Sequence, residues 1–285
     1  MKYISSFLFV AAIAFFMQSC DIIEAPYEEI INVDTSQNTN SDTIFRTILL
    51  EEFTGYRCAS CPQAADAMKD LKKVYPNTLE LLTIHSGGFV AVRASDSNAR
   101  DFQTAVADDI KDQYVVNVNP RIAVNRTTID GEFAIPFGKM QDAIAPMLNQ
   151  MATVGIKTDA TLNGNVISVD TELAYQLDGG EDDYLVHYIV VDSIVALQYD
   201  ARVSPNKVYD YVHTNVLVDG INGAFGIKVT PEGTPAKIAG ETSEFNDTYT
   251  ITGDKDWDRD QIYILTIVTD GAAGPIYQVN KTKVN

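Results

Sequence analysis

Two cysteines three positions apart, in Cys58-Ala59-Ser60-Cys61, are the residues whose types and spacing most directly predict chemistry in this 285-residue chain. Cysteines at this spacing can close a disulfide that exchanges with thiols of other molecules, and such a reversible disulfide needs no cofactor. The third cysteine, Cys20, has no neighbour at such spacing. The sequence therefore predicts one redox pair and no framework of structural disulfides.

The residues after the pair predict a helix that begins at the cysteines. Pro62 suits a first helical turn, where its N–H is not needed, and apolar residues then recur at helical spacing as far as Val74. Because a helix N-terminus stabilises a thiolate, we expect Cys58 to be the more exposed attacking cysteine and Cys61 the buried resolving one. Arg57 either adds positive charge beside Cys58 or is a solvated side chain.

Three interpretations of the cysteine pair are compatible with the sequence. It is a site of thiol–disulfide exchange, a disulfide that only staples a domain used for binding, or, least favoured, part of a zinc site, for which a second pair of ligands is missing. An open groove around Cys58 and Pro120 would favour exchange. A cover formed by Tyr56, by Phe89 or by residues 88–109 would favour binding.

The N-terminal residues predict export and a lipid anchor. The apolar run at residues 7–17 follows Lys2 and is shorter than the about 20 residues of a membrane-spanning helix, so it is typical of a signal peptide. The following Met17-Gln18-Ser19-Cys20 resembles the lipobox of bacterial lipoproteins, whose cysteine is lipidated and becomes the mature N-terminus. We expect a signal peptide over 1–19 and an acylated Cys20 held in a bilayer. An ordinary cleaved signal or an uncleaved anchor is the alternative.

The composition predicts a tether followed by folded protein. Residues 20–43 are rich in Asp, Glu, Asn, Thr and Ser and are expected to be flexible, although a strand that uses Ile30, Ile31 and Val33 is an alternative. Hydrophobic residues make up 46% of the chain, which is enough for large cores. The net charge of −18 repels phosphate backbones, so we expect no nucleic-acid partner.

Residues 44–152 alternate between strand and helix patterns. His85 follows the second strand, where it either lines the site or is a hydrogen-bonded structural residue, and Tyr56 either shields the disulfide or packs locally. The expected elements are strands at 44–53, 79–84 and 115–125, and helices at 62–74, 106–114 and 137–151.

From residue 153 the patterns predict strands alone. Asn163-Gly164 separates two alternating runs and predicts a hairpin with a type I′ turn. About seven strands over this length predict an immunoglobulin-like β-sandwich. His187 and His213 fall within strands and are expected to be structural. The expected strands are 154–162, 166–175, 185–191, 209–218, 248–252, 262–268 and 276–284.

Four alternating aspartates form a weak candidate for a metal site. Asp254, Asp256, Asp258 and Asp260 could supply oxygen ligands for Ca²⁺ from one loop. The EF-hand pattern is not met, because Arg259 stands at the sixth position where that loop has glycine. A solvated loop is the favoured interpretation, and we expect no metal.

The order strand, cysteine helix, strand, helix, X-Pro, strand and helix resembles the thioredoxin fold. In that family a buried acid lies six residues before the first cysteine, and Glu52 holds this position. The resemblance implies that Glu52 accepts the proton of Cys61. It also implies a cis peptide at Asn119-Pro120 beside the disulfide.

The whole chain more narrowly resembles the outer-membrane lipoprotein family named for outer membrane protein twenty-eight. The resemblance implies an outer-membrane location and leaves the membrane face open. The matching segments are the lipobox, EEFTGYRCASCP, IHSGG at 84–88, NPRIAVNR at 119–126 and YVHTNVLV at 211–218.

Together these patterns predict an α/β thioredoxin-like domain over 44–152 followed by an all-β immunoglobulin-like sandwich domain over 153–285. The expected function is thiol–disulfide exchange by a membrane-anchored lipoprotein, with protein thiols or disulfides of the cell envelope as partners. A non-catalytic surface lipoprotein that uses the same fold as a binding scaffold is the alternative. The expected site residues are Cys58, Cys61, Glu52 and Pro120, supported by Tyr56, Arg57, Asn119 and His85.

Overall fold

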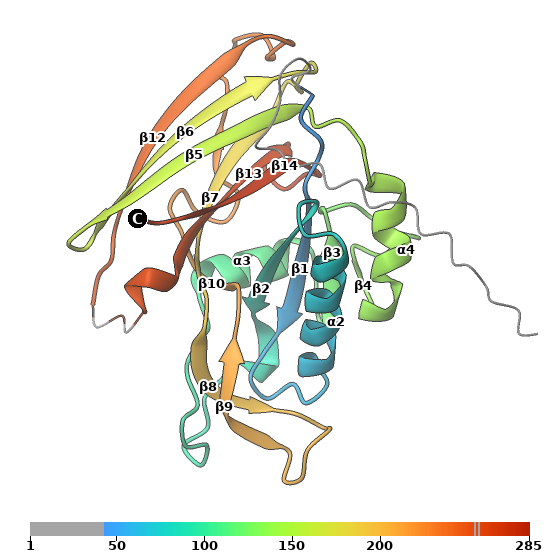
Figure 1. The fold of residues 1–285 in the computed structure, drawn as a ribbon, viewed down its shortest axis with the longest axis vertical. Coiled ribbons are helices and arrows are strands. Elements are labelled where there is room, and N and C mark those ends of the chain that lie inside the picture. Colours follow the sequence, from blue (N-terminus) through green and yellow to red (C-terminus); the bar gives the residue numbers. More distant parts are fainter. Residues whose placement is uncertain (1–42, 254, 256) are drawn as a thin grey trace, which may run out of the picture. The chain divides into compact units, whose positions relative to one another are not determined.

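The computed structural model describes residues 43–253, 255 and 257–285, and Thr43–Asn285 forms one compact unit. The described residues are mostly β-stranded and contain three α-helices, α2 (Cys61–Val74), α3 (Ala105–Gln113) and α4 (Met140–Ile144) (Figure 1). None of these helices has the length and apolar character needed to cross a membrane. The expected signal peptide, and the expected tether up to residue 42, lie outside the described residues.

A mixed sheet of nine strands dominates the structure (Figure 1). Its strand order is β14-β13-β7-β10-β2-β1-β3-β4, and β11 pairs with β7. β1 is parallel to β2 and antiparallel to β3, and the helix α2 connects the two parallel strands. The strands are β1 (Ile48–Thr54), β2 (Leu79–His85), β3 (Arg121–Val124), β4 (Ala134–Ile135), β7 (Asp183–Val191), β10 (Val216–Gly220), β11 (Ile227–Lys228), β13 (Ile262–Asp270) and β14 (Ile276–Lys283).

The strand β1 is buried along its whole length, and its side chains alternate between two cores. Leu49 packs in the core that contains α3, whereas Leu50 packs in the core that contains α2 and α4. The same alternation sends two neighbouring carboxylates, Glu51 and Glu52, to opposite faces of the sheet. β1 therefore places one buried acid on each side.

Two smaller sheets complete the β structure. One has the order β12-β6-β5, formed by β5 (Val154–Asn163), β6 (Val166–Tyr175) and β12 (Thr242–Thr250), and the other pairs β8 (Ile194–Tyr199) with β9 (Lys207–His213). The hairpin predicted around residue 164 is confirmed, because β5 and β6 pair antiparallel. Its turn is Gly164-Asn165 rather than Asn163-Gly164. Gly164 has φ of +63°, a conformation that glycine adopts without strain.

The predicted fold class is wrong in both halves. β1 to β4 do not form the sheet of a separate α/β thioredoxin-like domain, because the same sheet continues through β10, β7, β13 and β14. The later strands do not form an immunoglobulin-like sandwich, because five of them belong to this large sheet. The junction is a parallel pairing of β10 with β2, at Val216 and Thr83. The boundary expected after residue 152 thus lies within one compact unit.

One predicted strand, at residues 209–218, is two strands in the structure. β9 ends at His213 and β10 begins at Val216, and Asn215 between them has φ of 54°. This left-handed conformation is one that asparagine tolerates better than most residues, and it breaks the strand. As a result β9 pairs with β8, while β10 enters the large sheet.

Candidate functional site

The cysteine pair forms a disulfide at the start of α2. Cys58 and Cys61 are joined with a Cα–Cα distance of 5.4 Å. α2 begins at Cys61, with Ser60 as its N-cap residue and Pro62 in its first turn, so Cys58 lies in the turn that precedes the helix. Cys58 is 3% exposed and Cys61 is 2% exposed. The expectation of a more exposed Cys58 is therefore wrong, because both cysteines are buried.

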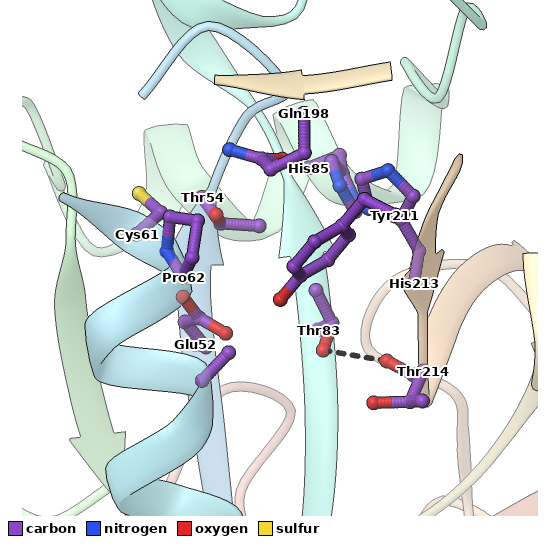
Figure 2. Close-up of a pocket in the computed structure, with 11 residues that line it drawn as sticks. Glu52, Thr54, Cys61, Pro62, Thr83, His85, Gln198, Tyr211, His213 and Thr214 are labelled. Carbon is purple, nitrogen blue, oxygen red and sulfur yellow. Dashed lines mark hydrogen bonds between the residues drawn. The ribbon is translucent and has the colours of Figure 1, made fainter. Parts of the chain in front are cut away.

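Glu52 lies beside this disulfide on the α2 face of the sheet, in a small pocket that Cys61 also lines (Figure 2). It is 2% exposed, and its Oε1 atom has no hydrogen-bond partner among the described residues. Burial raises the pKa of Glu52 from 4.5 to about 8, against smaller opposing effects of Thr54 and Lys69. The carboxyl is therefore protonated at neutral pH.

Two buried histidines and a tyrosine line the other side of this pocket (Figure 2). His85 ends β2, whereas Tyr211 and His213 come from β9, and the rings of His85 and His213 lie 5.4 Å apart. Neither ring nitrogen of His85, nor Nε2 of His213, has a hydrogen-bond partner in the described structure. Burial lowers the pKa of His85 well below its usual value and that of His213 to about 4. Both rings are therefore neutral at neutral pH.

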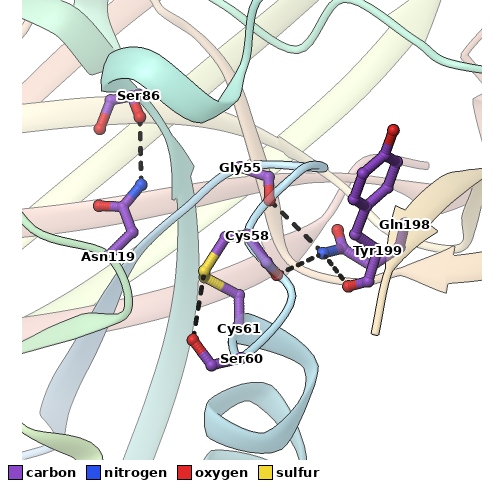
Figure 3. Close-up of a disulfide and its surroundings, with 8 residues drawn as sticks. All are labelled: Gly55, Cys58, Ser60, Cys61, Ser86, Asn119, Gln198 and Tyr199. Carbon is purple, nitrogen blue, oxygen red and sulfur yellow. Dashed lines mark hydrogen bonds between the residues drawn. A yellow bond between two sulfur atoms is a disulfide. The ribbon is translucent and has the colours of Figure 1, made fainter. Parts of the chain in front are cut away.

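The β8–β9 hairpin also holds the cysteine turn from outside (Figure 3). The side-chain amide of Gln198 donates hydrogen bonds to the carbonyl oxygens of Cys58 at 3.0 Å and Gly55 at 3.4 Å. The backbone N–H of Tyr199 donates to the carbonyl of Tyr56, and that of Ala201 to the carbonyl of Ala59. The turn that carries Cys58 is thus bonded along its length to the hairpin.

Asp96 joins three segments around the disulfide. Its carboxylate accepts hydrogen bonds from the hydroxyls of Tyr56 at 3.2 Å and Tyr199 at 3.0 Å, and from Nζ of Lys207 at 2.7 Å. The bond from Lys207, more than those from the tyrosines, holds the pKa of Asp96 below its usual value. Asp96 therefore connects the cysteine turn to both strands of the hairpin.

The remaining predicted supporting residues surround the same turn. Arg57 donates its backbone N–H to the carbonyl of Phe89 at 3.2 Å and its guanidinium to the carbonyl of Gly88. The Asn119–Pro120 peptide is cis, as the resemblance implied, and the Asn119 side chain donates to the carbonyl of Ser86 at 3.3 Å. Pro120 directly precedes Arg121, whose pairing with Phe53 sets it at the cysteine end of β1.

The other predicted positions lie apart from the disulfide or cannot be described. Cys20, Asp254 and Asp256 lie outside the described residues. Asp258 uses its carboxylate to accept a hydrogen bond from the backbone of Asp260 at 3.0 Å, and both side chains are exposed. In the described part of the chain, no three His, Cys, Asp or Glu residues are grouped so that they could hold a metal ion.

The contribution of the second half to this site was not predicted from the sequence. Gln198, Tyr211 and His213 were not predicted to lie at the disulfide, and His213 was expected only to be structural. No periodicity marks them. The one signal that could have located them is Asn215, since a break there frees β9 from the strand that follows. Asp96 falls within residues 88–109, which were considered only as a possible cover of Cys58.

The fold and site define a mostly β protein in which the buried strand β1 leads into a turn with a buried disulfide and a protonated acid beside it. The chain belongs to the family Outer membrane protein Omp28, whose model matches residues 107–285. The matched residues include the β8–β9 hairpin and begin after the cysteine pair. The predicted resemblance is thereby confirmed, and so is the outer-membrane location. No curated protein matches the chain.

Several solved structures are similar to this chain. HBP35 of Porphyromonas gingivalis aligns with a TM-score of 0.57 and 12% identity, over 85% of this chain and 76% of that one, which is a likeness of fold alone. A protein of Agrobacterium tumefaciens aligns with a TM-score of 0.47 and 13% identity, over 85% and 96%. A domain of the outer membrane lipoprotein Omp28 from Porphyromonas gingivalis gives 0.30 and 15%, over 47% and 89%. The last two scores are too low to support an argument.

Proposed function

We propose that Cys58 and Cys61 form a reversible disulfide that exchanges with thiols of proteins in the cell envelope. A partner thiolate attacks the sulfur of Cys58, and Cys61 leaves as a thiolate. A second thiolate of the partner then attacks the mixed disulfide and releases Cys58. The partner's two thiols become a disulfide, and its two electrons now reside on the two cysteines. The reverse sequence oxidises Cys58 and Cys61 again.

The observation that supports this proposal is the buried Glu52 in the pocket beside Cys61, whose Oε1 atom has no hydrogen-bond partner among the described residues. A thiolate released in an apolar setting needs a proton, and a carboxyl with a pKa of about 8 still carries one at neutral pH. A disulfide that only staples a turn gains nothing from such an acid. Burying Glu52 without a full set of partners costs free energy, which function would explain.

A structural disulfide is the second candidate, and the burial of both sulfurs favours it. Cys58 and Cys61 are 3% and 2% exposed, so a partner cannot reach either one without some movement of the surrounding chain. In this alternative the protein binds a partner through another surface. The reduction potential separates the two candidates.

We expect the disulfide to have a potential between about −120 and −270 mV, the range of known exchange catalysts. The full-length protein is equilibrated in dithiol redox buffers, quenched with an alkylating reagent and weighed by mass spectrometry. A Cys58→Ser variant, which cannot close the disulfide, serves as the control for complete alkylation of Cys61. A potential below about −300 mV would mean a structural disulfide and would overturn the proposal.

We further propose that Cys20 is acylated and holds the protein in the bilayer. The lipobox at residues 17–20 and membership of an outer-membrane family support this anchor. The expected result is a mass increase on the N-terminal peptide that a Cys20→Ser variant lacks. Full release of the wild-type protein from membranes by salt alone would contradict the anchor.

A further inference from the structure

The outer part of the β8–β9 hairpin, residues 198–207, lies directly on the turn that carries Cys58 (Figure 3). We call these residues the cover. Gln198 binds the carbonyl of Cys58, and the backbone of Ala201 binds that of Ala59 at 2.8 Å. On the helix side, Arg202 forms an ion pair with Asp66 of α2 at 2.7 Å. The cover therefore spans from the cysteine turn to the helix that follows it.

The contacts that hold the cover are polar. None of residues 198–207 belongs to an apolar core cluster of the described chain, whereas Ile194 and Ala196, nearer the base of the hairpin, do. Tyr199 adds one edge-to-face contact with the ring of Tyr56. Hydrogen bonds and surface ion pairs exchange readily with water, so segments held by them open at low free-energy cost compared with a packed core.

Asp96 makes charged hydrogen bonds at both ends of the cover. It holds Tyr199 at one end of the cover and Lys207 at the other, and it also holds Tyr56 next to the cysteine turn. Its carboxylate is nearly inaccessible, at 1% exposure, whereas the side chain of Lys207 is 25% exposed. Charge-assisted hydrogen bonds of this kind are about twice as strong as neutral ones. Asp96 therefore acts as a latch on both ends of the cover.

We propose that residues 198–207 form a cover, latched by Asp96, that selects among thiols by size. Both cysteines are buried while the cover is closed, so a folded protein thiol reacts only when the cover opens, whereas a small thiol needs a smaller movement of the surrounding chain. A hairpin from the second half of the chain thus completes the site. This hairpin determines which partner thiols react. This inference rests on the exchange function proposed above.

The test compares rates of disulfide reduction by dithiothreitol and by a folded protein that carries a reduced dithiol. In full-length protein, Asp96→Asn is expected to raise the rate with the protein dithiol about ten-fold, the equivalent of about 1.4 kcal/mol. The rate with dithiothreitol is expected to change much less. Asp70→Asn, which removes an exposed ion pair with Lys73 on α2, is the matched control and should change neither rate.

A second variant and a second measurement keep the inference testable. If Asp96→Asn does not fold, Lys207→Met removes one arm of the latch and should shift the rates in the same direction. Amide hydrogen exchange of Tyr199 and Ala201 should accelerate in both variants. Unchanged exchange and an unchanged ratio of the two rates would overturn the cover. A potential below about −300 mV with accelerated amide exchange would overturn the exchange function and leave the cover standing.

Discussion

Replacing Glu51 by glutamine is expected to lower the free energy of unfolding by about 3–5 kcal/mol, because it leaves a buried arginine charge without its partner. Glu51 and Arg126 form an ion pair at 2.9 Å, and both side chains are fully buried. Arg126 also donates to the hydroxyl of Tyr188 at 2.9 Å. These contacts join β1 to β7, which come from the two halves of the chain.

Urea unfolding of the wild-type protein, of E51Q and of an exposed control measures this effect. Lys73→Ala breaks an exposed ion pair with Asp70 and should cost less than about 1 kcal/mol. Replacing both buried partners, Glu51→Leu with Arg126→Met, should recover most of the loss, since no charge is then left buried. A loss below about 1 kcal/mol in E51Q would show that Arg126 finds other compensation.

Local elements of this fold could be predicted from the sequence, because their signals are local. Apolar spacing and Pro62 predicted α2 within one residue, and the alternation around Gly164 predicted the β5–β6 hairpin. The helix expected over residues 137–151 failed for an equally local reason. α4 ends at Ile144, and Pro146, which lacks the N–H that a continuing helix uses, lies in a 3₁₀ turn.

The arrangement of strands could not be predicted, because it depends on contacts between distant residues. The apolar sequence of β2 fits either an edge strand that pairs with β1 alone or an interior strand that pairs on both sides. The structure places β10 beside it, 133 positions apart at Thr83 and Val216 (216 − 83). This pairing joins the strands of the two expected domains in one sheet. Because β9 directly precedes β10 in the chain, the pairing also places β9 near the disulfide.

The residues at the disulfide itself were predicted from the sequence, whereas the residues that bind the cysteine turn from other segments were not. Glu52, Cys58 and Cys61 lie together because they belong to a strand, a turn and a helix that follow one another directly in the chain. Their spacing in the sequence was therefore enough to predict the group. Asp96 and Gln198 reach the same turn from segments whose sequences resemble ordinary loops and strands. Cys58 is 3% exposed, and its burial was not predicted from the local sequence.

The pocket beside the disulfide is expected to make the stability of the protein depend on pH. Glu52 keeps its proton up to a pH of about 8 in the folded protein but loses it near 4.5 when unfolded. Between these values the folded state binds one more proton, so its stability falls as pH rises, by about 1.4 kcal/mol per pH unit. His85 and His213 act in the opposite sense, since their lowered pKa values cost stability as pH falls below about 6.5.

Because His85 and His213 are present in both proteins, the difference in stability between a Glu52 variant and wild type isolates the contribution of Glu52. The Glu52→Gln variant keeps the shape of the side chain but cannot ionise. Relative to wild type it should gain about 2 kcal/mol of stability between pH 6 and pH 8, measured by urea unfolding at each pH. Glu244→Gln, an exposed change on β12, should show the same dependence of the free energy of unfolding on pH as wild type. If E52Q also showed this dependence, Glu52 would already be ionised at pH 6, and it could not supply the proton that the Cys61 thiolate needs.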